Sequence, residues 1–219
     1  MKHLESLLFI ALLFYGITGY AQHSPIMIGF ELGPSMGSLN GEVDKRAIGE
    51  KKVGFGFHAG LTAHFSQSEK ASLNLGLVFT QKPLRTLWTE VDAGGNEISI
   101  LSQIPYNFIQ LPINGRFYVG TASKYYLDLG GFLSFVISNP GRRLPGRNTI
   151  DLSEQLDWGL GFGFGRRFFL KGNQYLSTGF SMDLGLRDVN KFNSIRLSVD
   201  SLYSRGLFLK FAYLWPQNK

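Results

Sequence analysis

The sequence predicts an all-β protein, an eight-stranded antiparallel up-and-down transmembrane β-barrel. Three observations predict this fold: eight segments alternate apolar and polar residues, their connections alternate in length, and the composition suits strands that face lipid. Glycine contributes 27 residues and phenylalanine 19, whereas charged residues make up only 17% of the chain. A disordered or coiled-coil chain has the opposite balance, with few aromatics and many charges.

The N-terminal segment predicts export. An apolar run from Leu7 to Gly19 spans about 13 residues, too few to cross a bilayer as a helix. Small residues at Gly19 and Ala21 then suit cleavage by a signal peptidase. We expect residues 1–21 to be a signal peptide and residues 22–219 to form one outer-membrane barrel domain. The alternative is a buried N-terminal helix.

The strand signal is an apolar residue at every second position, which places one face of each strand against an apolar environment. Leu176, Phe180 and Leu184, for example, alternate with Ser177, Ser181 and Asp183. Eight segments show the pattern, and single-chain bacterial barrels have even strand numbers. They span residues 26–33, 53–65, 71–80, 109–119, 125–138, 156–165, 176–186 and 207–215.

The connections between these segments are short and long in strict alternation. Short links and long external loops alternate in this way in outer-membrane barrels, where the short links face the periplasm. The order places both termini in the periplasm. The short links are Ser66–Lys70, Gly120–Lys124 and Leu170–Asn173, and the long ones are Pro34–Lys52, Pro83–Pro105, Asn139–Glu154 and Asp188–Ser204.

The polar faces of the strands must then line the lumen. An eight-stranded barrel has an interior that side chains fill, and a buried charge needs a partner. We therefore expect four acids and four bases to form a structural network of ion pairs that plugs the lumen; a gated ion path or a small ligand site is the alternative. The expected members are Glu31, Arg116, Asp128, Asp157, Arg167, Asp183, Arg187 and Lys210.

Glycines recur at every second position from Gly159 to Gly165. The spacing differs from a phosphate-binding loop, and no helical pattern follows. We expect the glycines to share one strand face and to give space to large lumenal side chains such as Tyr118, Tyr126 and Phe132.

Catalytic and metal-binding patterns are weak. His58 and His64 share a face but lie ~20 Å apart along a strand, so they cannot bind one metal ion. No Ser-His-acid spacing stands out. We expect no enzyme activity, no metal and no cofactor.

Two segments carry a family resemblance. Tyr106-Asn107-Phe108-Ile109-Gln110-Leu111-Pro112 resembles the aromatic-Ile-Gln/Glu-Leu/Ile-Pro strand of the PorT-type outer-membrane β-barrel family of Bacteroidetes, and Tyr126–Gly131 resembles the strand that follows it there. A signal peptide that ends in Ala21-Gln22 is also typical of that group. The resemblance implies a barrel in the bacterial outer membrane. The family's namesake takes part in protein secretion, so the resemblance also implies an accessory role in protein export.

The leading functional hypothesis is a structural or surface-binding barrel, or an accessory to protein export. A narrow porin-like conduit is the alternative, and a lipid-modifying barrel enzyme is a third. A net charge of +6 suits nucleic-acid binding, but an exported chain rarely meets nucleic acid, so we expect no nucleic-acid partner. Arg142, Arg143 and Arg147 are close in one long loop, where they suit the phosphates of lipopolysaccharide. Outer-membrane lipid and other outer-membrane or secretion proteins are the expected partners.

Overall fold

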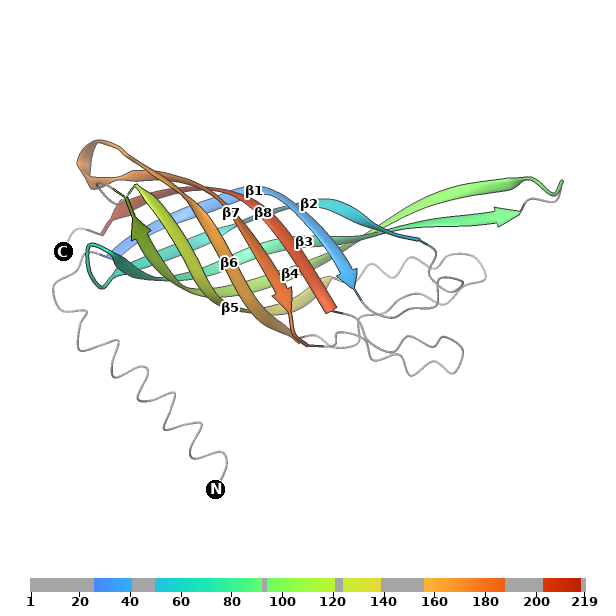
Figure 1. Cartoon of the computed structure of the whole chain (residues 1–219), viewed down its shortest axis with the longest axis horizontal. Helices are drawn as coiled ribbons and strands as arrows, with labels where there is room; N and C mark the ends of the chain where they lie inside the picture. Colours follow the sequence, from blue (N-terminus) through green and yellow to red (C-terminus); the bar gives the residue numbers. More distant parts are fainter. Residues whose placement is uncertain are drawn as a thin grey trace, which may run out of the picture.

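A computed structural model of the chain describes residues 26–40, 50–91, 94–120, 124–138, 156–187 and 203–217. Eight antiparallel strands close into one barrel, in which each strand pairs with its neighbours in sequence and β1 pairs with β8 (Figure 1). The predicted fold class is therefore confirmed. The strands are β1 (Ile26–Asn40), β2 (Glu50–Ser66), β3 (Ala71–Val91), β4 (Glu97–Val119), β5 (Tyr125–Ser138), β6 (Leu156–Phe169), β7 (Tyr175–Gly185) and β8 (Tyr203–Pro216).

One end of the barrel, here called the turn end, carries the three short connections. The start of β1 and the end of β8 lie at the same end, where Met27 pairs with Pro216. The β6–β7 connection contains the 3-10 turn η2 (Lys171–Asn173), in which Gly172 has a φ of 73° that glycine adopts at no steric cost. The predicted signal peptide, residues 1–21, lies outside the described residues.

The opposite end, here called the hairpin end, differs from the sequence prediction. Pro83–Pro105 was expected to be a loop, but β3 continues to Val91 and β4 starts at Glu97, and the two strands pair throughout. They extend beyond the other strands as a long hairpin (Figure 1). The expected loop Pro34–Lys52 is likewise shorter, because β1 runs to Asn40 and β2 starts at Glu50.

Pro83 and Pro105 lie opposite each other in the β3–β4 ladder, and their position explains the difference. Proline is tolerated in a strand where its missing N–H group faces no partner. The β2–β3 register shifts between Val53 and His58, beside Pro83, and β4 pairs with β5 only from Asn107 onward. Neither proline therefore removes a hydrogen bond that a regular ladder would have made.

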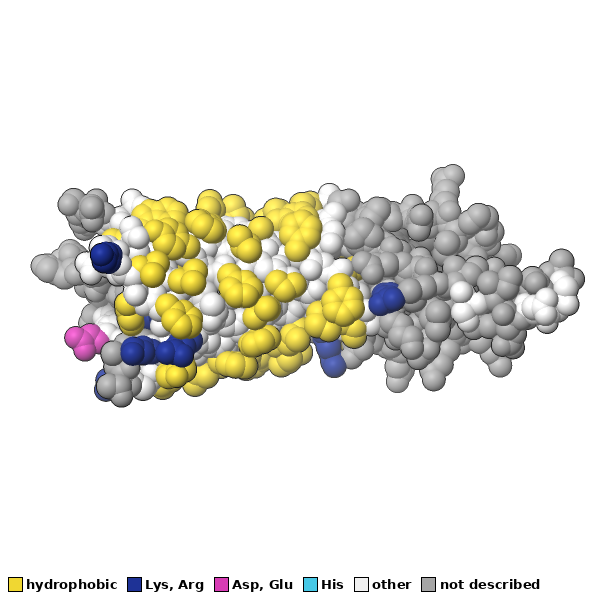
Figure 2. Space-filling view, turned by 90° about the horizontal axis from the view of Figure 1, so that it is seen from above, with side chains coloured by type: hydrophobic (Ala, Val, Ile, Leu, Met, Phe, Trp, Pro, Cys, Tyr) yellow, Lys and Arg dark blue, Asp and Glu magenta, His cyan; other side chains and the backbone are white. Residues whose placement is uncertain are grey.

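The polarity of the barrel is inverted relative to a water-soluble protein. Large apolar side chains face outward, as with Phe30 and Leu61, which are 45% and 60% exposed. Glu31, the next residue after Phe30, is 9% exposed and faces the lumen. Apolar side chains are spread over the barrel face that Figure 2 shows. Such a surface is stable where lipid surrounds it. Among the described residues, no helix has the length and apolar character needed to span a membrane.

Candidate functional site

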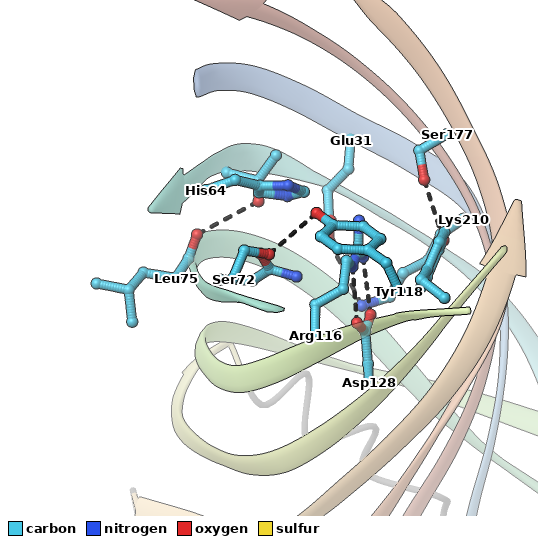
Figure 3. Close-up of polar contacts among 12 residues, drawn as sticks. Glu31, His64, Ser72, Leu75, Arg116, Tyr118, Asp128, Ser177 and Lys210 are labelled. Atoms are coloured by element: carbon cyan, nitrogen blue, oxygen red, sulfur yellow. Dashed lines mark hydrogen bonds and ion pairs between the residues drawn. The ribbon is translucent and has the colours of Figure 1, made fainter. Parts of the chain in front are cut away.

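The lumen near the turn end contains the shortest ion pair. Arg116 on β4 and Asp128 on β5 are direct partners in the ladder. Arg116 donates from Nε to Asp128 Oδ1 at 2.7 Å and from Nη2 to Oδ2 at 2.8 Å (Figure 3). Both residues are buried, and a bidentate pair of this kind combines strong attraction with a defined geometry.

Aromatic rings surround this ion pair. The guanidinium of Arg116 lies 3.7 Å from the ring centroid of Tyr126, and that of Arg167 lies 3.6 Å from the ring centroid of Tyr118. A cation stacked on an aromatic face is attracted by the ring electrons. The Tyr118 hydroxyl also lies 3.0 Å from that of Ser72 (Figure 3). The stacked rings and guanidinium groups fill the lumen at this level.

His64 and Tyr175 belong to the same end of the lumen. The Tyr175 hydroxyl lies 2.6 Å from His64 Nδ1, and Arg167 lies 5.2 Å from the Tyr175 ring centroid. His58 lies six residues away on β2, next to Phe208, with its ring 5.4 Å from the Phe208 ring. The two histidines therefore belong to different layers, and no metal-binding cluster forms among the described residues.

A second ion pair joins the neighbouring strands β1 and β8 on the lumenal side. Lys210 Nζ on β8 lies 3.7 Å from Glu31 Oε1 on β1 (Figure 3). The side chain of Lys210 is 22% exposed and that of Glu31 is 11% exposed. Glu31 and Lys210 line both cavities described below, as does Pro112.

A third group of charges lies closer to the hairpin end and centres on Lys82. Its Nζ atom lies 3.8 Å from Asp157 Oδ2 and 3.9 Å from Asp183 Oδ2. It also lies over the rings of Phe132 and Phe108, at 4.6 and 5.3 Å from their centroids. Lys82 is only 3% exposed, so a cation on β3 is enclosed by two carboxylates and two aromatic rings.

The two aspartates near Lys82 have further partners. Ser204 donates to Asp157 Oδ2 at 2.5 Å, and Gln110 donates to Asp183 Oδ2 at 2.6 Å. The hydrogen bonds connect β8 to β6 and β4 to β7. Since β3 supplies Lys82, five strands contribute to this one cluster. It links opposite walls of the barrel, which sheet pairing alone cannot do.

All eight charges predicted for the lumen are buried or half-buried in the structure. Glu31, Asp128, Asp157, Asp183 and Arg116 are buried there, while Arg167 and Lys210 are half-buried. Arg187, the eighth predicted charge, is also half-buried and lies two residues beyond the end of β7. The base that sequence reasoning missed is Lys82. Arg142, Arg143 and Arg147 lie outside the described residues.

The alternation of polar residues along β3 could have predicted the lumenal position of Lys82. Ser72, Asn74 and Thr80 are the buried polar positions of β3, and Lys82 continues the same parity. The predicted strand ended at residue 80, and a loop was expected from Pro83 onward. Extending the alternation by two residues would have placed Lys82 in the lumen.

Two cavities lined by described lumenal residues are small. A cavity beside His58 and Gln110 holds about 10 Å³ for the centres of water molecules, and one beside Arg116 and Tyr126 holds about 20 Å³. A single water needs roughly 10–15 Å³ of such space. Each cavity therefore has room for one or two water molecules and for no organic ligand.

Comparisons with known proteins agree with the geometry. A family model described as outer membrane protein beta-barrel domain matches residues 20–191. Among solved structures, the chain is similar to the outer membrane protein AlkL in lipid bilayers, at 9% identity and a TM-score of 0.50, covering 90% of this chain and 92% of that one. It is also similar to OprG of Pseudomonas aeruginosa, at 14% identity and a TM-score of 0.45, covering 88% and 97%. A third similar structure is Ail of Yersinia pestis, at 14% identity and a TM-score of 0.40, covering 86% and 98%. At such identities the likeness concerns the fold alone. The comparison with curated proteins finds no significant match.

Proposed function

The chain belongs to the outer membrane protein beta-barrel domain family and resides in a bacterial outer membrane, and we propose that it is a plugged barrel that presents a binding element at the cell surface. The observation that supports this proposal is the filled lumen. The ion pairs centred on Arg116, Lys210 and Lys82 occupy successive levels of it, with aromatic rings between them. The structural role of the charges is to satisfy one another inside a wall of eight strands.

The charge balance of the lumen argues against a conduit. Among the described strand residues, Glu31, Asp128, Asp157 and Asp183 match the bases Lys82, Arg116, Arg167 and Lys210 in number, so neither sign dominates among these eight charges. The Glu31–Lys210 pair lines both of the water-sized cavities, so its charges compensate each other beside that space. A porin-like path would require several of these contacts to break together.

Planar-bilayer recording tests this function. The purified chain should show no steady conductance, because ions meet closed layers at several levels. Reproducible open-channel steps from the unmutated protein would reject the plug and support the porin-like alternative. A double variant, Lys82→Ala with Arg116→Ala, provides the positive control, since it removes a cation from each end of the lumen.

The element that a plugged barrel presents is the β3–β4 hairpin. It extends beyond the barrel wall at the hairpin end, opposite the three short turns (Figure 1). Short turns face the periplasm in outer-membrane barrels, so the hairpin faces the exterior. This orientation gives the protein an extended surface for contact with other molecules.

A role as an accessory to protein export is supported by the PorT-type resemblance of residues 106–112 and 126–131. Under this proposal the host is a member of the Bacteroidetes, and the partners are secretion proteins of the outer membrane. Pull-down of the tagged chain from detergent-solubilised outer membranes should recover such a protein. Recovery of the barrel alone, under conditions that preserve known membrane complexes, would reject the export role.

Lipopolysaccharide is the proposed lipid partner, through Arg142, Arg143 and Arg147. Changing all three residues to alanine should weaken binding to lipopolysaccharide micelles, whereas the same change at Lys70, Lys124 and Lys171, near the turn end, should not.

The proposal also assigns no enzyme activity to the chain. Release of acyl chains from phospholipid or lipopolysaccharide by the purified protein would support the lipid-modifying alternative instead.

A further inference from the structure

The β3–β4 hairpin has an open edge. On one side, β4 pairs with β3 from Glu97 to Ile113 and beyond. On its other side β4 pairs with β5 only from Asn107 onward, so no described strand pairs with residues 97–105 there. An open edge presents backbone N–H and C=O groups that can accept one more strand.

The sequence of this edge is suited to strand pairing. Proteins usually protect an open edge with lysine, proline or a bulge. Glu97 and Pro105 stand at the two ends of this edge, and the seven residues between them, Ile98 to Ile104, contain no lysine, no proline and no charged residue. Ile98, Ile100 and Ile104 recur at even positions, and isoleucine is among the residues that favour strands. The edge therefore favours the addition of an extended segment.

The edge is also complementary to itself. In an antiparallel ladder centred on Leu101, Leu101 pairs with its own copy and Ile98 pairs with Ile104. Ser99 then pairs with Gln103, and Ile100 with Ser102. Toward the two ends of the ladder, an apolar residue thus pairs with an apolar residue and a polar residue pairs with a polar residue. A two-fold axis perpendicular to the sheet generates such a pairing from two identical edges.

From this geometry we propose that the hairpin edge binds the hairpin edge of a second copy of the chain, and that the two copies lie in opposing membranes. The hairpin extends along the barrel axis (Figure 1). In two copies within one membrane β4 runs toward the membrane in both, whereas antiparallel pairing requires one copy to be inverted. The inverted copy belongs to another membrane. The proposal rests on the surface-binding function above and names its partner.

The expected spacing is set by the strand. Six residues separate Leu101 from Asn107, where β4 joins β5, which is about 20 Å of strand. Two barrels joined at Leu101 therefore have their rims about 40 Å apart. Homotypic contact of this kind would let the protein hold two vesicles or two cells together.

Single cysteines test the register, since the chain contains no cysteine of its own. Opposite residues of an antiparallel pair have Cα atoms about 4.5–5.5 Å apart, which fits a disulfide. The full-length protein with Leu101→Cys should therefore form a disulfide-linked dimer on mild oxidation. Ser99→Cys alone should not, but vesicles carrying Ser99→Cys mixed with vesicles carrying Gln103→Cys should give the dimer.

Proteoliposomes test whether the pairing occurs between membranes. Vesicles carrying the unmutated chain should cluster, as seen by light scattering, and Ile100→Lys with Ile104→Lys should abolish clustering. Thr89→Lys, a charge in the same hairpin but on β3, is the matched control and should leave clustering intact.

Three results with the Leu101→Cys variant would overturn the proposal. A thiol that reacts with an impermeant label but forms no dimer would show an edge that binds no second copy and is free for a foreign partner. A thiol that is protected from the label and forms no dimer would indicate cover by the chain's own residues. Dimers that form only within one vesicle would reject pairing between membranes.

Conductance of the same preparation separates this proposal from the function on which it rests. If the vesicles do not cluster and the bilayer shows no conductance, only the pairing of the two edges is rejected. Open channels reject the plugged function itself.

Discussion

Arg116 and Asp128 lie directly opposite each other on β4 and β5, and Asp128 accepts two hydrogen bonds from Arg116 across the ladder. The register of two neighbouring strands thus creates an ion pair of 2.7 Å, closer than the Lys82 and Lys210 pairs. Asp128→Asn should leave the Arg116 charge buried without its counter-ion and reduce the free energy of unfolding by about 3 kcal/mol. Denaturant unfolding in detergent, followed by tryptophan fluorescence, measures this loss.

The matched control replaces both partners. Arg116→Met combined with Asp128→Leu removes the two charges together and should cost clearly less than Asp128→Asn alone, because no charge remains unpaired. Equal losses in the single and double variants would show that the pair contributes little beyond its volume.

Lys82 should contribute to the stability of the barrel, because its ammonium group lies 3.8 and 3.9 Å from the carboxylates of Asp157 and Asp183. Lys82→Met leaves Asp157 and Asp183 facing each other without a cation and should lower stability by roughly 3 kcal/mol. Adding Asp157→Asn and Asp183→Asn to the same variant should recover much of the loss, since the uncompensated charge disappears. Lys210→Met, which affects one acid at a more exposed position, is the comparison and should cost less. Failure of the two asparagines to recover stability would contradict the electrostatic role.

The glycines of β6 should differ in their tolerance of a methyl group. A Cβ atom at Gly165 would collide with the Tyr126 hydroxyl and the carbonyl oxygen of Thr178, whereas one at Gly161 would lie 3.3 Å from its nearest neighbour, Asn114 Oδ1. Gly165→Ala should therefore lose about 1–3 kcal/mol through overpacking, and Gly161→Ala should lose less. Heat-modifiable migration on gels gives the unfolding temperature of each. Similar temperatures for both variants would argue against close packing at Gly165.

Topology can be read from surface cysteines. Ser68 and Gly172 at the turn end and Asn96 at the hairpin end are all exposed, so their labelling reports the side of the membrane and not burial. On intact cells an impermeant thiol reagent should label Asn96→Cys and leave Ser68→Cys and Gly172→Cys unreacted. All three should react after lysis. The reverse pattern on intact cells would invert the barrel and place the hairpin in the periplasm.

Much of this fold was predictable because strand alternation is a local property. Side chains at successive positions point to opposite faces, so a period of two identifies the strands and the lumenal residues without any knowledge of pairing. Glu31, Asp128, Asp157 and Asp183 were assigned to the lumen on this basis, and all four are buried. The prediction that glycines give space to a large lumenal ring applies to Tyr126, whose hydroxyl meets Gly165 and Gly179.

The sequence by itself therefore determined the number of strands, their inward and outward faces and the end at which the short turns lie. Only the tertiary structure decided which charges meet, because pairing depends on register and on barrel closure, which bring together residues as distant in sequence as Lys82, Asp157 and Asp183. It also decided that β3 and β4 continue past Pro83 and Pro105. Whether proline ends a strand depends on the neighbouring strand that would have used its N–H group, and that neighbour is known only once the barrel is closed.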